Sequence, residues 1–247
     1  MAGVPYTYEM LFKLGLKRLN LDSIKTFTQA GGKLSDTLIK EYCTFCDLND
    51  KEFIVMYGQT EATARMRYIS FNDLKRKIGS IGKPIPNGSL KIINCRKYQK
   101  INGFEVGELI YSGPNVCPGY ASSFEEMEIK EDKKKYLDTG DLAYKDDEGF
   151  FYICGRKNRF AKISGIRVSL DDVEMLSKEL AESAVTSDDK YINIFFKKDE
   201  NDNSLGKKLK NIISTKVNIP HTLIKTIELE EIPRAASGKI LHNNLRK

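Results

Sequence analysis

Metal-binding side chains are scarce in this sequence. It contains five cysteines and two histidines. Only Cys43 and Cys46 have the spacing of metal ligands, and no second close pair completes a four-ligand zinc site. Since His221 and His242 are the only histidines, we expect no metal cluster. An odd number of cysteines without a disulfide framework is typical of a reducing compartment.

Long apolar runs and a targeting segment are also missing. No apolar run approaches the ~20 residues that span a bilayer. The first residues have no basic region followed by an apolar core, so they do not resemble a signal peptide. The sequence therefore predicts a cytoplasmic protein with no membrane partner.

Neither sign of charge dominates. There are 40 Lys and Arg residues against 34 Asp and Glu residues, a net charge of +6. A basic balance can attract phosphates, but the longest basic run, residues 133–135, directly follows Glu131 and Asp132. We expect a solvated face there and no nucleic-acid partner.

The pattern of residues changes twice along the chain. Up to about residue 78, apolar residues at helical spacing mark 8–19 and 34–46, and the run 53–56 ends at Gly58 as a buried parallel strand would. From about 78 to 153, short β-rich segments alternate with turns. After Gly155 the predicted elements are a hairpin over 161–168, a helix from Ser169 to Leu180, a strand over 191–196, a helix over 205–217 and, from residue 227, a strand, a loop and a short helix.

The first motif with chemical meaning is Tyr57-Gly58-Gln59-Thr60-Glu61, directly after the predicted strand. A hydroxyl beside a carboxylate at a strand-to-helix turn suits a phosphate and its magnesium, which prefers one or two carboxylates plus phosphate oxygens. Backbone N–H groups at such a turn face the anion. Tyr57 offers a flat face to a purine. The same residues are also typical of a capping box, and the five residues alone leave both interpretations open.

The second motif is Asp138-Thr139-Gly140-Asp141. A carboxylate has two acceptor oxygens, and the two hydroxyls of a ribose are two donors. Asp141 is therefore a candidate ribose ligand, although the same four residues are good turn formers in any protein.

Two basic motifs follow. Arg156, after Gly155, carries a guanidinium fork that suits a ligand at a domain boundary. Lys239 ends a glycine-flanked loop that begins at Pro233, and its ammonium suits the charge on a phosphate during acyl transfer. Alone, such an Arg indicates a surface turn and such a Lys a solubilising charge.

Together, the order and spacing of these motifs resemble the adenylate-forming superfamily, which contains acyl-CoA synthetases, adenylation domains of nonribosomal peptide synthetases, and luciferases. Further matches extend the resemblance over essentially the whole chain. They are Gly3-Val4-Pro5, Ala30-Gly31-Gly32, Gly79 to Pro84, and the stretch from Gly107-Glu108-Leu109 through Gly119-Tyr120. The segment from Gly155 to Gly165, which contains Arg156, belongs to the ordered motifs themselves.

The resemblance implies an α/β fold and a ligase activity. Residues 1–154 would be the C-terminal part of the large AMP-binding domain, with a parallel-sheet α/β remnant and a β-rich subdomain. Residues 155–158 would be a hinge and 159–247 a small, mobile α+β domain. A carboxylic acid would attack the α-phosphate of ATP, releasing pyrophosphate. The acyl-adenylate would then pass its acyl group to the thiol of coenzyme A or of a carrier-protein pantetheine.

It also implies roles for individual residues. On the nucleotide side, Gly31 and Gly32 would line the adenine and acyl pocket, and Tyr57 would stack on adenine. Gly58 and Gln59 would also bind the nucleotide, Thr60 would contact a phosphate, and Glu61 would position Mg²⁺. Asp141 would bind the ribose hydroxyls with help from Arg156. The catalytic residues would be Lys239, Thr60 and Glu61. Lys162 and Gly165 would lie on the thiol-transfer face, and Asn158 would be the hinge residue.

Two departures from the family pattern matter. The hinge position is usually Asp or Lys, and here it is Asn158, whose amide tolerates unusual backbone angles. The family's Ser/Thr/Gly-rich phosphate loop should precede everything in this sequence. Residues 79–83 do not replace it, because their spacing is wrong and Pro84 follows. We therefore expect a truncated product or one half of a split enzyme, with a separately encoded N-terminal half as partner.

Three functions remain open from the sequence. One is an acyl-CoA ligase acting on a small carboxylic acid. Another is amino-acid adenylation with an acyl-carrier protein as acceptor, although no carrier-domain serine motif follows Lys239. The third is a catalytically silent remnant that binds nucleotide weakly or serves as an interaction module.

Overall fold

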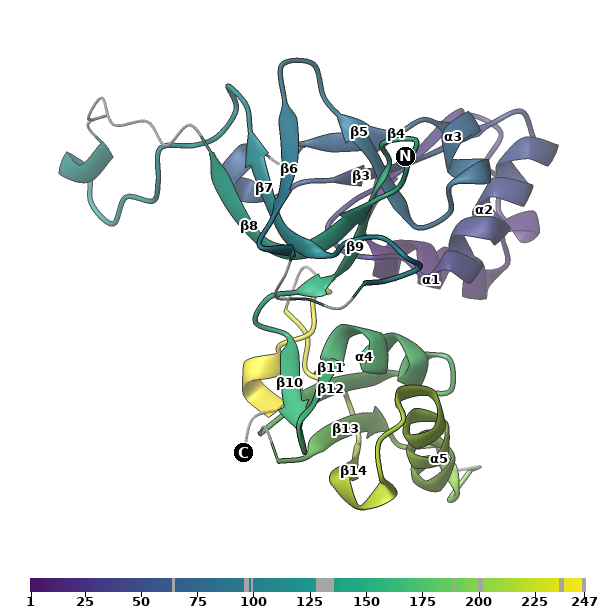
Figure 1. Cartoon of the computed structure of the whole chain (residues 1–247). Coiled ribbons are helices and arrows are strands. Elements are labelled where there is room, and N and C mark those ends of the chain that lie inside the picture. The colour runs from purple at the N-terminus through teal and green to yellow at the C-terminus, as the bar shows by residue number, and fades with distance from the viewer. Residues whose placement is uncertain are drawn as a thin grey trace. The chain divides into compact units, whose positions relative to one another are not determined.

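The chain folds into two compact units, Met1–Cys154 and Gly155–Lys247 (Figure 1). The computed structural model describes all residues except 64, 96, 97, 99, 128–135, 189, 200, 201, 236, 237, 246 and 247. The basic run at 133–135 lies outside the described residues. The predicted α/β class is confirmed, since helices and strands alternate in both units.

The first unit is built on a nine-stranded sheet with the order β1-β2-β3-β4-β5-β9-β8-β7-β6. The strands are β1 (Ala2–Gly3), β2 (Thr26–Gln29), β3 (Glu52–Tyr57), β4 (Arg67–Ile69), β5 (Ser80–Pro84), β6 (Ser89–Ile93), β7 (Gly107–Ser112), β8 (Leu137–Lys145) and β9 (Phe151–Arg156). The expected β-rich part, β5 to β9, is joined to the parallel strands in one continuous sheet.

In the sheet of the first unit, the described residues show parallel pairing among the first three strands. β1 pairs with β2 and β2 with β3 in parallel, because the helices between them carry the chain back to the same edge. β4 pairs antiparallel with β3 and with β5. The predicted strand at 53–56 is therefore parallel on one side and antiparallel on the other, since the connection from β3 to β4 is too short for a crossover.

Helices α1 (Pro5–Leu14), α2 (Asp36–Leu48) and α3 (Phe71–Arg76) lie together at one end of the first unit (Figure 1). Proline at the first position starts α1, and Gly15, with φ of 84°, ends it before the limit predicted from periodicity. The Ser35 hydroxyl accepts a hydrogen bond from the backbone N–H of Leu38 and caps α2. Helix α3 was not predicted, because six residues are too few to show a period. The short 3₁₀ turns are η1 (Leu16–Arg18), η2 (Thr60–Ala62) and η4 (Glu125–Met127).

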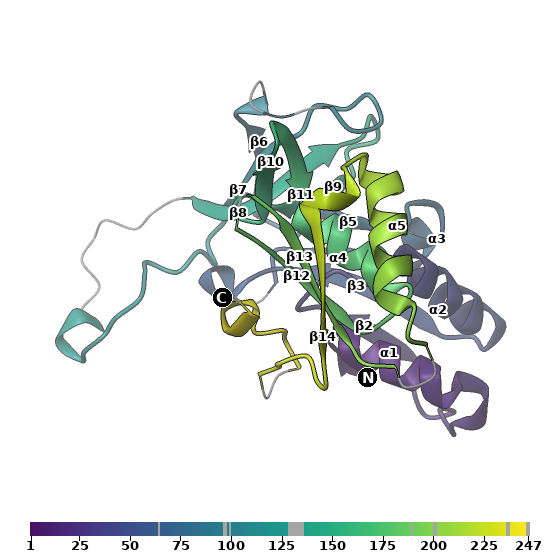
Figure 2. The same cartoon turned by 90° about the horizontal axis from the view of Figure 1, so that it is seen from below.

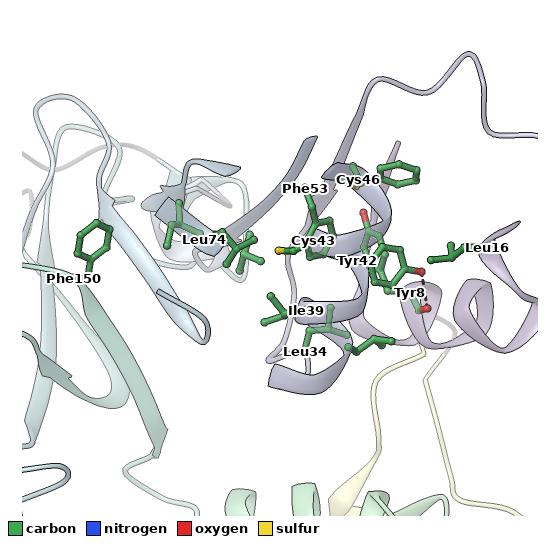
Figure 3. Packing of buried hydrophobic residues seen from close by; sticks show 14 residues of the cluster. Tyr8, Leu16, Leu34, Ile39, Tyr42, Cys43, Cys46, Phe53, Leu74 and Phe150 are labelled. Carbon is green, nitrogen blue, oxygen red and sulfur yellow. Dashed lines mark hydrogen bonds between the residues drawn. The ribbon is translucent and has the colours of Figure 1, made fainter. Parts of the chain in front are cut away.

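Aromatic rings form the centre of the core beneath α1 and α2 (Figure 3). The rings of Tyr42 and Phe53 stack with centroids 5.1 Å apart, and Tyr8 meets Tyr42 edge-on at 5.0 Å. The Tyr42 hydroxyl donates to the Tyr8 carbonyl oxygen at 2.8 Å, so its buried polar group is satisfied. This core fixes the helices against β2 and β3, whose ends carry the candidate site.

The second unit contains a hairpin and a three-stranded sheet ordered β12-β13-β14. Figure 2 shows α5 running beside β14. Helix α5 has the predicted bounds, whereas α4 ends two residues before the predicted Leu180. The elements are β10 (Phe160–Ile163), β11 (Ile166–Ser169), α4 (Leu170–Lys178), β12 (Ser183–Ser187), β13 (Ile192–Lys197), α5 (Leu205–Val217), η5 (His221–Leu223), β14 (Ile224–Leu229) and η6 (His242–Leu245).

The second unit has its own apolar core. Val173 of α4 and Leu209 and Ile213 of α5 are fully buried against Ile194 of β13. Across the described part of the chain, none of the helices has the length and apolar content needed to cross a bilayer. All five cysteines are free.

Candidate functional site

The carboxyl ends of β2 and β3 lie at one edge of the sheet, because these strands are parallel neighbours. β2 runs into Gly31 and Gly32. The buried Gln29 side chain folds this turn back by donating from Nε2 to the Gly32 carbonyl oxygen at 2.9 Å. A Cβ on Gly31 or Gly32 would come within 3.2 Å of Val4 or Pro5. Glycine at both positions therefore gives a close fit against the start of α1, and the φ of 83° at Gly31 favours glycine there.

β3 leads into the motif from Tyr57 to Glu61, with Gly58 and Gln59 in the connection. The structure forms only the three-residue turn η2 here, and Gln59 at its N-cap makes no side-chain capping bond. The capping-box interpretation is therefore wrong, and the strand leads into a 3₁₀ helix of a single turn. Because the described residues form no longer helix here, an anion would be held by side chains and local N–H groups rather than by the terminus of an α-helix.

Tyr57 and Asp141, the aromatic and acidic residues of the first two motifs, lie in contact. The Tyr57 hydroxyl donates to Oδ2 of Asp141 at 2.5 Å, across 84 residues of sequence. A flat sheet would hold β3 and β8, four places apart in strand order, roughly 19 Å from each other. The sheet is therefore strongly coiled, and Tyr57 packs on a cluster that contains Leu109, Ala143 and Phe151.

The backbone around Asp141 is fixed by its neighbours on β8. The Thr139 hydroxyl donates to the Leu109 carbonyl oxygen at 2.8 Å and accepts from the Asp141 N–H at 3.2 Å. Gly140 has φ of 71°, a conformation that favours glycine. Asp141 is only 5% exposed, so its carboxylate has a defined environment.

Glu61 is held by a loop that the sequence did not single out for this role. The Tyr120 hydroxyl donates to Oε1 of Glu61 at 2.5 Å, and this bond raises the pKa of Tyr120. The Cys117 N–H donates to the Glu61 carbonyl oxygen at 2.8 Å, and Asn115 Nδ2 donates to the Ala62 carbonyl oxygen at 2.8 Å. The family match from Gly107 through Tyr120 includes this loop, but it assigned none of these contacts.

Within the residues that the structure describes, no three His, Cys, Asp or Glu side chains gather as a metal cage. A magnesium ion needs no such cage when phosphate oxygens supply further ligands. Glu61 fits that mode, with a single carboxylate beside the Thr60 hydroxyl on one short turn.

Arg67 on β4 was not predicted as a site residue. It is fully buried, directly opposite Tyr57 in the antiparallel register. Its guanidinium lies 4.2 Å from the centre of the Phe151 ring, and Nη2 donates to the Gly82 carbonyl oxygen. Nε and Nη1 have no hydrogen-bond partner. Burial lowers the pKa of Arg67 to about 9, against the opposing effect of Tyr57. A charged residue is expected at the surface, so no sequence pattern predicted that Arg67 is buried.

The residues predicted near the hinge belong to the second unit. Arg156 is exposed, and its backbone N–H donates to Oδ2 of Asp171 at 3.1 Å. Asn158 lies in the turn between β9 and β10 without a positive φ. The positive φ of 139° lies instead at Gly155, where a Cβ would come within 3.3 Å of Ser169 Oγ. Asn158 thus adopts no positive φ, whereas Gly155 does.

Lys162 and Gly165 share the β10–β11 hairpin. Ser164 and Gly165 form its two-residue turn with φ of 50° and 86°, the pattern of a type I′ turn. Lys162 pairs with Arg167 across the strands and is exposed. The hairpin therefore presents a lysine beside an open glycine turn.

Lys239 is exposed on a closed loop of the second unit. Arg234 and Ile240 form an isolated bridge, and the Ala235 N–H donates to the Lys239 carbonyl oxygen at 2.8 Å. Arg234 is in turn held by Glu182, with Nη2 2.8 Å from Oε1. The backbone at Lys239 is therefore anchored on both sides.

A buried carboxylate ties the segment after Lys239 to α4. Oε2 of Glu174 lies 2.7 Å from Nε2 of His242 and 2.9 Å from Nη2 of Arg159. Lys178 Nζ lies 2.8 Å from Oε1. Burial by itself raises the pKa of Glu174, but the hydrogen bond from His242 and the charge of Lys178 outweigh it, so the pKa lies well below its usual value.

The sequence is similar to one protein family and to several known ligases. Residues 1–121 match the family described as AMP-binding enzyme. The chain is 30% identical to 4-hydroxybutyrate–CoA ligase 1 of Metallosphaera sedula, over 98% of this chain and 44% of that protein. It is 29% identical to a 2-succinylbenzoate–CoA ligase of Bacillus cereus, over 77% of this chain and 40% of that protein.

Solved structures share the fold. O-succinylbenzoate coenzyme A synthetase of Bacillus subtilis, in complex with ATP and a magnesium ion, superimposes with a TM-score of 0.72 at 27% identity. The alignment covers 100% of this chain and 51% of that one. The same synthetase in complex with AMP gives a TM-score of 0.73 at 25% identity. The chain thus spans about half the length of the relatives it matches.

Proposed function

The chain belongs to the AMP-binding enzyme family, and we propose that it takes part in ATP-dependent activation of a small carboxylic acid and its transfer to coenzyme A. In the first step a carboxylate oxygen bonds to the α-phosphorus of ATP and pyrophosphate leaves. In the second step the thiol sulfur bonds to the acyl carbon, the thiol proton is lost, and AMP leaves.

The observation that carries this proposal is the contact between Tyr57 and Asp141. It brings a flat ring, a buried carboxylate and the Thr60–Glu61 pair to one part of the first unit. A ring for a base, an acid for a ribose diol and a hydroxyl–carboxylate pair for phosphates are the groups that a nucleotide requires.

Each group then has a defined task within the first unit. Tyr57 stacks on adenine, and the glycine turn at Gly31 and Gly32 lets the ligand approach the backbone. Asp141 accepts both ribose hydroxyls. Thr60 donates to a phosphate oxygen. A magnesium ion held by Glu61 and the phosphates would neutralise charge on the phosphate oxygens.

The second unit supplies the groups for transfer. We assign to Lys239 the neutralisation of charge between the carboxylate and the α-phosphate, because its anchored loop presents an exposed ammonium. Arg156 assists at the ribose, Asn158 and its neighbours serve as the hinge, and the hairpin of Lys162 and Gly165 receives the thiol. Loss of one such charged donor typically costs ~10²–10³ in rate.

The complete activity is proposed for a protein of the relatives' length, since this chain corresponds to about half of it. ATP–pyrophosphate exchange should therefore need an N-terminal half, supplied in the same protein or separately. The five free thiols support a cytoplasmic location.

Calorimetry with AMP and with a non-hydrolysable acyl-adenylate mimic tests the proposal directly. The wild-type chain is expected to bind the mimic more tightly than AMP, since the catalyst is complementary to the reacting species. Asp141→Ala should weaken the binding of both by at least about tenfold, because hydrogen bonds to a charged group are lost. If the chain binds neither compound, a catalytically silent remnant becomes the better description.

A further inference from the structure

The carboxylate of Asp141 is positioned by another side chain. Its Oδ2 accepts the Tyr57 hydroxyl at 2.5 Å, the short length expected when the acceptor is ionised. A carboxylate is planar, so a bond to one of its oxygens fixes the orientation of both. Because Asp141 is only 5% exposed, water competes little with the bond.

The Tyr57 side chain is itself constrained. Arg67 lies directly opposite it in the β3–β4 register, so both side chains are on the same face of the sheet. Arg67 is fully buried, and its charge interacts with Tyr57. A positive charge beside a phenol favours polarisation of the O–H bond toward an acceptor, which here is Asp141.

We propose that the hydroxyl of Tyr57, supported by the buried Arg67, is a positioning group that holds the Asp141 carboxylate ready for both hydroxyls of a ribose. The tyrosine then contributes to sugar recognition through its oxygen as well as to base binding through its ring. Preference for ribonucleotides over 2′-deoxyribonucleotides follows from the fixed carboxylate. This inference rests on the proposed nucleotide-binding function.

The first test needs no ligand. Thermal unfolding is measured for Tyr57→Phe, Asp141→Asn and the double variant, with Tyr68→Phe as matched control, because Tyr68 is a half-exposed tyrosine on the neighbouring strand β4. If the bond couples the two residues, the double variant shifts the midpoint by less than the sum of the single shifts. Additive shifts would overturn the inference.

The second test measures affinity for AMP and 2′-deoxy-AMP by calorimetry on the same variants. Because a hydrogen bond to a charged group is lost, Tyr57→Phe should lower the affinity for AMP about tenfold. The preference for AMP over 2′-deoxy-AMP should shrink, whereas Tyr68→Phe should leave it unchanged. In the Asp141→Asn background, Tyr57→Phe should change AMP affinity less than about twofold.

The outcomes separate the inference from the proposed function. The inference is wrong if Tyr57→Phe lowers AMP affinity equally in the wild-type chain and in Asp141→Asn. It is also wrong if Tyr57→Phe leaves the preference for AMP over 2′-deoxy-AMP unchanged. Neither result contradicts nucleotide binding. If the wild-type chain does not bind AMP, the proposed function is wrong, and the inference about sugar preference is wrong as well.

Discussion

At the scale of single residues, two buried charged side chains differ in whether they have partners of opposite charge. Glu174 is surrounded by His242, Arg159 and Lys178, and its pKa is pushed below the usual value. Arg67 has an aromatic ring and one carbonyl oxygen, and among the described residues its Nε and Nη1 find no hydrogen-bond partner. Burying an unpaired charge is costly. Glu174 therefore stabilises the second unit, whereas Arg67 is retained beside the candidate nucleotide site at a cost in stability.

Glu174 predicts how the second unit depends on pH. A carboxyl whose pKa is lower in the folded than in the unfolded chain stabilises the fold above the unfolded pKa of about 4.3. That stability is lost as the pH falls below this value. Glu174→Gln should destabilise the second unit at pH 7 by about 3 kcal/mol and flatten the fall in stability between about pH 4 and pH 2.

The measurement is urea unfolding of both proteins across this pH range. Glu179→Gln is the matched control, because Glu179 follows α4 and is exposed. The control should keep the wild-type pH profile. Identical pH profiles for the two variants would show that Glu174 is not the group responsible.

At the scale of elements, the pairing of β4 with β5 depends on one glycine. Gly82 has φ of 80°, and a Cβ there would overlap the Tyr68 carbonyl oxygen and lie 2.8 Å from Ile69 Cα. Gly82 also offers its carbonyl oxygen to Arg67. Since β4 and β5 join the parallel strands to the rest of the sheet, this contact decides whether the sheet is continuous.

Gly82→Ala should therefore be much more damaging than a glycine substitution at a similar φ elsewhere. Gly149 is the matched control, because its φ is 83° and a Cβ there meets nothing within 4 Å. Backbone strain alone predicts a loss of about 1–2 kcal/mol for Gly149→Ala. The added overlap predicts more than about 3 kcal/mol for Gly82→Ala. Equal losses in chemical denaturation would contradict this account.

At the scale of the whole molecule, the chain consists of two units with separate cores. The first is centred on Tyr8, Tyr42 and Phe53, and the second on residues of α4, α5 and β13. Units that each bury their own apolar surface are able to unfold independently. Two transitions are therefore expected in scanning calorimetry.

The substitutions at Gly82 and Glu174 show which unit each calorimetric transition belongs to. Gly82→Ala should lower only the transition of the first unit, and Glu174→Gln only that of the second. Added AMP should raise the first transition, because binding to the folded state stabilises it. A single transition that both variants shift equally would show that the units unfold together.

The sequence by itself determined the local elements and the order of the motifs. Helix α5 has the predicted bounds, because apolar periodicity and the turn residues beside it are properties of neighbouring residues. Short elements such as α3 and β12 were missed, since they contain too few residues to show a period. The motif residues were found from their chemistry and spacing, and their roles remain proposals.

Only the tertiary structure decided which of these residues meet. The bond between Tyr57 and Asp141 joins residues 84 positions apart, and it exists because the nine-stranded sheet coils until β3 approaches β8. Strand order and coiling depend on pairings between distant segments, which no local pattern contains. For the same reason the sequence could not show that Arg67 is buried beside Tyr57, or that Tyr120 reaches Glu61.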